Sequence, residues 1–220
     1  GISESVPENN DFKNALAISY AKLGETHSAL GNLDEALRFF ELDTDLTKQL
    51  FEAFPQNVSF KNSLAISYEK LGSTHSKLGN LDEALRFFVD VTELFEQLFD
   101  AFPKNVSFKN GLAISYAKLG ETHSALGNLD EALRFFEQYN QLEQQLFEAF
   151  PQNVSFKNGL ALSYTKLGDI YQKLEPEKVK AYFLKAEQIW EEMVEAFPAY
   201  PAFQKDLDWV KGQLAGLDEG

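Results

Sequence analysis

Apolar residues recur at three- and four-residue steps along most of this chain, a spacing typical of amphipathic helices that bury one face. One such stripe consists of Leu112, Tyr116, Leu119, His123 and Leu126. A second follows a short polar gap and consists of Ala132, Phe135, Phe136, Leu142 and Leu146. The second helix is predicted to end at Phe150, because Pro151 disfavours helix at the residue before it. Together the two stripes predict a helical hairpin with helices A and B of about 20 residues each.

The polar gap between the two stripes carries turn signals. Gly127 stands where a helix commonly ends on a residue with positive φ. Asn128 is predicted to be the N-cap of helix B, with Glu131 completing a capping box. Asp130 and Arg134 are spaced as an i,i+4 ion pair.

Gly120 lies inside the first stripe, where it costs about 1 kcal/mol relative to Ala. A residue without Cβ is useful there if the two helices cross closely. Ala132 is the small residue expected opposite it.

The hairpin is repeated along the chain with a fixed period. Phe-Lys-Asn stands at 12–14, 60–62, 108–110 and 156–158, a spacing of 48 residues. Such a period is typical of stacked units, none of which buries its apolar face alone. The predicted divisions are 1–11 as the tail of a preceding repeat, four repeats at 12–59, 60–107, 108–155 and 156–202, and a C-terminal capping helix and tail at 203–220. The fourth repeat lacks the Gly between its helices and is expected to turn differently.

The positions that recur resemble the tetratricopeptide repeat family. In the third repeat they are Tyr116, Leu119-Gly120, Gly127, Asp130-Glu131-Ala132 and Phe136, and the first two repeats match them closely. The repeat here is a long-helix variant, since the family usually repeats every 34 residues. The resemblance implies an all-α fold, an α-solenoid of stacked antiparallel helix hairpins that forms a superhelix. It also implies a protein-protein or peptide interaction module rather than an enzyme.

The composition of the chain narrows the classes of partner that it could bind. The net charge is −14 over 220 residues, which disfavours binding to nucleic acid and to anionic membrane surfaces. No apolar run approaches a membrane span, and no cysteine is present. A cytoplasmic location is the default expectation.

Few side chains in this sequence are candidates for catalysis or for metal binding. His27, His75 and His123 hold one position of three successive repeats, and stacked repeats would separate them by about 10 Å. That is too far to share one metal ion with bonds of about 2 Å. Tyr171 holds the same position in the fourth repeat. The histidines are therefore interpreted as packing residues, and no catalytic residue, metal or cofactor is expected.

Lysines recur at one position of all four repeats and form a ladder along the predicted stack. The position three residues after each lysine is acidic in three of the four repeats. The candidate groove-binding residues are Lys22, Glu25, Lys70, Ser73, Lys118, Glu121, Lys166 and Asp169. The family resemblance implies that this region faces the concave groove. Two interpretations stay open: ordinary solvated lysines neutralised by neighbouring acids, or a site for an anionic partner.

Helix B contains a variable window. Residues 42–49 and 138–145 differ almost throughout, whereas the segments on either side are nearly identical. The window varies on one helix face, at Asp43, Thr47, Val91, Phe95, Tyr139 and Glu143. Either this face contacts something different in each repeat, with Phe95 and Tyr139 as aromatic anchors if exposed, or these residues fill space along a lengthened helix.

The leading hypothesis is a non-enzymatic module that binds an unidentified protein or peptide. It is expected to be a fragment of a longer repeat array, serving as scaffold or sensor arm of a multidomain protein. The alternative is a structural spacer or self-assembly element with weak end-to-end association through its first helix.

Overall fold

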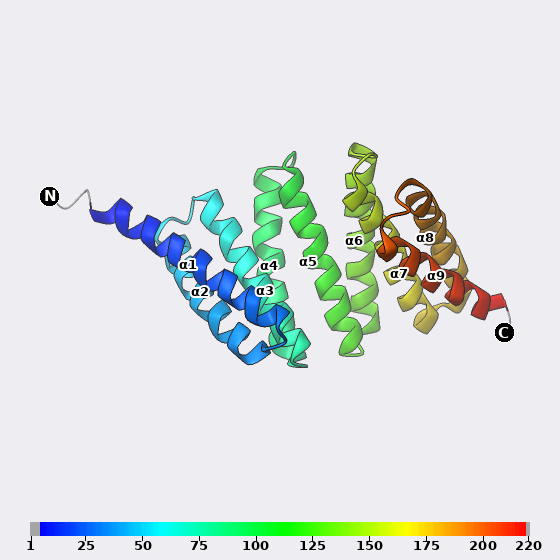
Figure 1. Ribbon diagram of the computed structural model, residues 1–220, viewed down its shortest axis with the longest axis horizontal. Coiled ribbons are helices and arrows are strands. Elements are labelled where there is room, and N and C mark those ends of the chain that lie inside the picture. Colours follow the sequence, from blue (N-terminus) through cyan, green and yellow to red (C-terminus); the bar gives the residue numbers. More distant parts are fainter. Residues whose placement is uncertain (1–4, 219–220) are drawn as a thin grey trace. The chain divides into compact units, whose positions relative to one another are not determined.

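The structure is a computed structural model that describes the backbone of residues 5–218 and the side chains of residues 10–217. Within this range every element is an α-helix (Figure 1). The helices are α1 (Ser5–Ala29), α2 (Leu33–Ala53), α3 (Val58–Lys77), α4 (Leu81–Ala101), α5 (Val106–Ala125), α6 (Leu129–Ala149), α7 (Val154–Leu174), α8 (Pro176–Ala196) and α9 (Pro201–Asp218).

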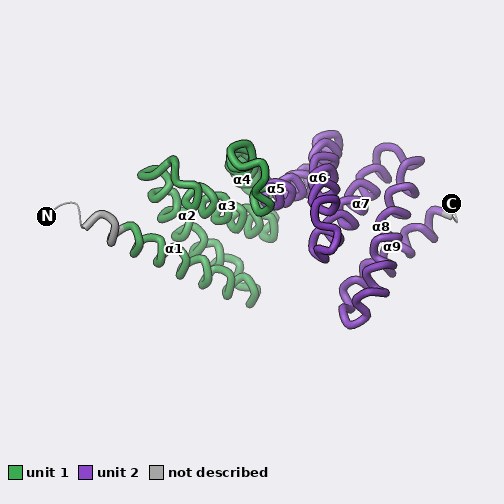
Figure 2. The backbone as a smooth tube through the Cα atoms, turned by 90° about the horizontal axis from the view of Figure 1, so that it is seen from above, with its two compact units in different colours: residues 1–108 green, residues 109–220 purple. Residues whose placement is uncertain are grey.

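The chain divides into two compact units, residues 1–108 and 109–220 (Figure 2). Unit 1 holds α1 to α4 and the first residues of α5, and α1 packs on α2, α2 on α3, and α3 on α4. Unit 2 holds the rest of α5 and α6 to α9, and α6 packs on α7, α7 on α8, and α8 on α9. Within each unit the helices thus pack on their neighbours in sequence, and the predicted all-α fold of stacked antiparallel hairpins is confirmed there.

The turn from helix A to helix B ends on a glycine with positive φ, as predicted. Gly31, Gly79 and Gly127 have φ of 79°, 81° and 82°. After α5 the backbone N–H of Asn128 donates to the carbonyl of His123 at 2.9 Å, and that of Gly127 donates to Ser124 at 3.2 Å. This pair of bonds is a Schellman motif, which satisfies the last carbonyls of the helix.

The predicted capping box at the start of α6 is wrong. Asn128 precedes the helix, but its side chain makes no capping hydrogen bond. Its backbone is held at ψ 69° by the Schellman turn rather than in the extended conformation usual for an N-cap. The predicted ion pair of Asp130 is also wrong, because Arg134 binds Glu131 instead, with Nη2 2.6 Å from Oε2.

Side-chain caps occur at the other turn, from helix B to the next helix A, where none was predicted. Asn57 Oδ1 accepts hydrogen bonds from the backbone N–H groups of Ser59 and Phe60 at 2.9 and 3.2 Å. Asn105 and Asn153 make the same pair of bonds one and two repeats later. The caps define where α3, α5 and α7 begin.

The close approach expected at Gly120 exists, but its partner is Phe136 rather than Ala132. A Cβ at Gly120 would lie 2.5 Å from the Phe136 ring. Gly24 and Gly72 meet Phe40 and Phe88 in the same way. The ring fills the space that the missing Cβ leaves, so the recurring glycine and phenylalanine form one packing unit.

The ends of the chain depart from the repeat. The predicted tail at 1–11 lies partly outside the described residues, and from Ser5 the chain is helical and continuous with α1. Between α7 and α8 a single residue, Glu175, replaces the glycine turn, as expected for the fourth repeat. In α9 the side chains of Leu207, Val210 and Leu214 are buried in the core of unit 2.

Candidate functional site

A cavity of about 250 Å³ lies in unit 1 between α1 and α3, above α2. Helix α1 lines it with Asn14, Ala17, Ile18, Ala21, Lys22 and Glu25, α2 with Asp43 and Thr47, and α3 with Ser63, Ile66 and Lys70. The cavity thus brings together five of the predicted site residues: Lys22, Glu25, Asp43, Thr47 and Lys70.

Lys70 and Glu25 join the two helices at this cavity. Lys70 Nζ lies 2.7 Å from Glu25 Oε1, and the lysine side chain is 19% exposed. A partly exposed pair of this kind contributes about 1 kcal/mol or less. The pair nonetheless neutralises the charge of Lys70.

A second hollow of about 440 Å³ shares Glu25 and Lys70 and continues along the same two helices. Its lining includes Ser73, whose hydroxyl donates to Glu69 Oε1 at 2.9 Å. The two hollows together form a trough between α1 and α3, which we call the unit 1 groove.

Helix α2 supplies the floor of the first cavity. Asp43 and Thr47 are 5% and 3% exposed. Burial raises the pKa of Asp43 to about 6, with Lys70 lowering it and Glu25 raising it further. The Thr47 hydroxyl donates to the backbone carbonyl of Asp43 and lies 3.4 Å from the Ser67 hydroxyl of α3.

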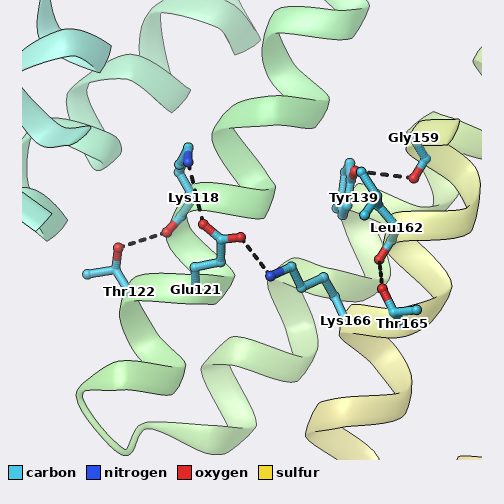
Figure 3. Close-up of polar contacts among 8 residues, drawn as sticks. All are labelled: Lys118, Glu121, Thr122, Tyr139, Gly159, Leu162, Thr165 and Lys166. Atoms are coloured by element: carbon cyan, nitrogen blue, oxygen red, sulfur yellow. Dashed lines mark hydrogen bonds and ion pairs between the residues drawn. The ribbon is translucent and has the colours of Figure 1, made fainter. Parts of the chain in front are cut away.

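Unit 2 shows the same ladder at Glu121, which lies between two lysines (Figure 3). Lys166 Nζ is 2.9 Å from Glu121 Oε1, and Lys118 Nζ is 3.5 Å from Oε2. Burial raises the pKa of Glu121, but the two lysines outweigh it and leave the pKa below its ordinary value. Asp169 is half-buried, and burial raises its pKa against the opposing effects of Lys166 and Lys173.

Of the two alternatives left open for the variable window, burial supports the second, that its side chains fill space along helix B. All six of its positions are buried, namely Asp43, Thr47, Val91, Phe95, Tyr139 and Glu143. In unit 2 the physical reason is visible (Figure 3). Tyr139 points at the next helix A, where its hydroxyl donates to the Gly159 carbonyl at 3.2 Å.

Glu143 lies one turn further along α6 and also packs on Gly159. A Cβ at Gly159 would overlap the Glu143 carboxyl group, so the glycine makes room for it. Glu143 is 4% exposed, its Oε2 has no hydrogen-bond partner, and burial raises its pKa to about 7. In unit 2 the window therefore faces inward, against the next helix A.

Apolar side chains at the mouth of the cavity were not among the predicted site residues. Ile18 and Ile66 line it while 49% and 41% exposed. Ile114 occupies the same repeat position and is similarly exposed. The signal was present in the sequence: an isoleucine recurs at period 48 on helix A, outside the stripe that forms the core.

The histidines pack as aromatic rings. The rings of His27, His75 and His123 stack on Phe39, Phe87 and Phe135 with centroids 5.3 to 5.6 Å apart. Tyr171 stacks on Tyr182 in the fourth repeat at 5.1 Å. Among the described residues, no three His, Asp or Glu side chains are grouped so as to hold a metal ion.

No helix in the described part of the chain contains a stretch apolar and long enough to span a bilayer.

Sequence models of the tetratricopeptide repeat family match residues 16–55 and 63–139, together more than half of the chain. With the stacked hairpins, these matches show that the chain belongs to the tetratricopeptide repeat family. Members of this family are in general protein-protein interaction modules and are typically not catalytic. Among curated proteins, none matches the sequence.

Solved structures with the same fold have low sequence identity. BtubC (BKLC) from P. vanneervenii is 19% identical, with a TM-score of 0.68 over 82% of this chain and 65% of that one. The apo form of RapI is 11% identical, with a TM-score of 0.64 over 91% and 64%. A putative kinesin light chain of Podosopora anserina with nearly identical TPR-like repeats is 17% identical, with a TM-score of 0.58 over 94% and 91%. This chain thus spans slightly less than two thirds of the length of the first two.

Proposed function

We propose that this protein binds an extended segment of a partner protein in the unit 1 groove, and that it serves as a scaffold or sensor arm of a larger protein. The observation that carries the proposal is the cavity itself, with two exposed isoleucines at its mouth. Ile18 and Ile66 present apolar surface beside buried polar groups, the combination that binding sites typically offer.

The experiment is a selection of dodecapeptides from a random display library on the full chain, followed by affinity measurement on variants. The double variant Ile18→Ser/Ile66→Ser should weaken the selected peptides at least tenfold. Its melting temperature should change little, because both side chains are largely exposed.

Leu42→Ser is the matched control. Leu42 is 38% exposed but does not line the cavity, so its loss should leave peptide affinity unchanged. If the selected peptides bind the double variant as tightly as the wild type, the groove is not the binding site.

A second candidate, end-to-end self-association, is favoured by the exposed face of α1. Phe12 and Leu23 are 69% and 44% exposed, whereas Phe108 and Leu71 at the equivalent positions are 8% and 3% exposed. Apolar positions that are covered in later repeats are thus open on α1. Light scattering over a range of concentrations tests this candidate: a mass that rises with concentration and returns to that of one chain in Phe12→Ser/Leu23→Ser supports it, and a constant monomer mass excludes it.

A further inference from the structure

The first and third repeats differ in what occupies the space between successive A helices. In the third repeat, Tyr139 and Glu143 extend from α6 to Gly159 of α7. The equivalent positions of the first repeat hold Asp43 and Thr47, whose side chains are shorter, and the equivalent of Gly159 is Ser63. The first cavity is lined by these three residues. It is therefore the space that a longer pair of side chains fills two repeats later.

The lining of the cavity has a buried part and an exposed part. Asp43, Thr47, Ala17 and Ala21 are buried, whereas the isoleucines, Lys22 and Glu25 at its mouth are exposed. Its volume of about 250 Å³ exceeds the roughly 150 Å³ of a cavity that admits benzene. The cavity is large enough for one side chain of a bound segment.

Asp43 is the charged group of the buried part. In the described part of the chain its carboxylate accepts no hydrogen bond, and the Thr47 hydroxyl beside it donates to the backbone carbonyl of Asp43 instead. Lys70 acts on Asp43 electrostatically but is bound to Glu25 at 2.7 Å. Burial disfavours the ionised form of the Asp43 carboxylate, and a cation supplied by a ligand offsets that cost.

From this arrangement we infer that the cavity between α1 and α3 is a specificity pocket for one basic side chain, arginine above all, of the partner segment. The inference rests on the proposed function. The guanidinium would bind the Asp43 carboxylate through paired N–H donors, which its planar fork favours over an ammonium. The aliphatic stem would pack against Ile18 and Ile66. Lys22 lies at the exposed mouth, where water and salt screen its repulsion, and the net charge of −14 attracts basic partners.

The test uses the full chain and N-acetyl-arginine-N-methylamide as probe, followed by NMR of the Ile18 and Ile66 methyl groups. The arginine probe should shift these methyls saturably. The citrulline analogue, which has nearly the same shape but no charge, should bind at least tenfold more weakly, and the glutamate analogue should not bind. Equal binding of citrulline, or saturable binding of glutamate, overturns the inference.

Variants locate the site. Asp43→Asn keeps the shape of the pocket and should weaken the arginine probe at least tenfold, whereas Asp45→Asn, on an exposed position of the same helix, should have no effect. Retained binding in Asp43→Asn overturns the inference.

The repeat offers a second pair of variants. Asp43→Tyr/Thr47→Glu/Ser63→Gly copies the third repeat and should close the pocket. Tyr139→Asp/Glu143→Thr/Gly159→Ser copies the first repeat and should create a second arginine site, seen at the methyls of Ile114 and Leu162. Arginine binding that persists in the first of these variants, with its helicity unchanged, contradicts the assignment.

The two proposals fail separately. If library peptides depend on Ile18 and Ile66 but bind Asp43→Asn as tightly as wild type, the pocket inference is wrong and the proposed function stands. If the arginine probe binds through Asp43 but no library peptide depends on the isoleucines, the cavity binds arginine, but the proposed function is wrong and the cavity does not select a partner segment.

Discussion

At the scale of single residues, the same repeat position carries very different chemistry. Position 43 and its equivalents are Asp43, Val91 and Tyr139, and all three are buried. Two carboxyl groups are buried on this helix face, Asp43 in unit 1 and Glu143 in unit 2, and burial raises the pKa of both. These positions therefore make stability depend on ionisation.

The variant Glu143→Gln should change how stability depends on pH. The pKa of Glu143 is raised to about 7 from its ordinary value of 4.5, so the folded chain binds this proton more tightly than the unfolded chain. The free energy of unfolding that this group contributes is complete below pH 4.5 and is lost as the pH rises through 7. The variant should match the wild type at pH 4 and exceed it at pH 8 by on the order of 3 kcal/mol.

Urea unfolding at the two pH values measures this difference. Glu131→Gln is the control, because Glu131 is exposed and should show no such change. Parallel pH profiles for Glu143→Gln and the wild type would show that the carboxyl group is solvated in solution.

Replacing the three histidines by tyrosine should preserve the fold. Each histidine ring stacks on a helix B phenylalanine, and Tyr171 already makes the equivalent stack on Tyr182. Circular dichroism should show unchanged helicity, whereas alanine at the same positions should cost about 0.5–1.5 kcal/mol for each lost ring contact. A large loss of helicity in the tyrosine variant, or a stoichiometric metal in the wild type, contradicts the packing role.

At the scale of helices, glycine has two separate uses. In the turns, Gly31, Gly79 and Gly127 provide positive φ. Inside helix A, Gly120 admits the Phe136 ring, a need that outweighs the helix propensity lost. The two uses predict different responses to substitution.

The variant Gly120→Ala should destabilise the protein by about 1–3 kcal/mol, because the new Cβ overlaps the Phe136 ring. Gly212→Ala is the matched control: it lies within α9, no atom stands within 4 Å of where its Cβ would be, and it should stabilise by about 0.4–1 kcal/mol. Thermal melts of the two variants should move in opposite directions. A stabilised Gly120→Ala would show that α5 and α6 do not approach closely.

Some asparagines at helix starts cap the helix with their side chain and others do not, and replacing the two kinds should cost different amounts of stability. Asn153→Ala removes two capping hydrogen bonds from α7 and should cost about 1 kcal/mol. Asn128→Ala removes no capping bond from α6 and should cost only a few tenths. Equal losses in chemical unfolding would contradict the assignment of the caps.

At the scale of the whole molecule, the chain consists of two compact units whose helices pack on their sequence neighbours. A stack of this kind needs its last helix to shield apolar surface. In unit 2, α9 buries Leu207, Val210 and Leu214 against a cluster that includes Trp190 and Phe183.

Removing residues 200–220 should therefore cause association before it unfolds the rest. Loss of the three buried side chains exposes the apolar cluster that includes Trp190 and Phe183. The mass measured by light scattering should therefore rise, while the helicity of the remaining chain persists. Removing only 216–220 keeps all three side chains and should leave the mass unchanged. A longer truncation that stays monomeric and equally stable would show that α9 is not a cap.

Much of the hairpin was determined by the sequence alone. The end of α6 before Pro151, the glycine turn at Gly127 and the stacking position of His123 follow from periodicity and turn chemistry, which act over a few residues. The capping box failed because two local signals competed, and the Schellman turn at Gly127 set the backbone of Asn128.

Only the tertiary structure decided which side chains contact each other across neighbouring helices. The pairing of Gly120 with Phe136 and the burial of Glu143 against Gly159 depend on how helix B is rotated against the A helices on either side. The cavity over Asp43 depends on the same rotation and on the length of side chains from three helices at once. Helical periodicity places a residue on a face, but it does not tell which neighbouring helix that face meets or whether the side chain fills the space between them.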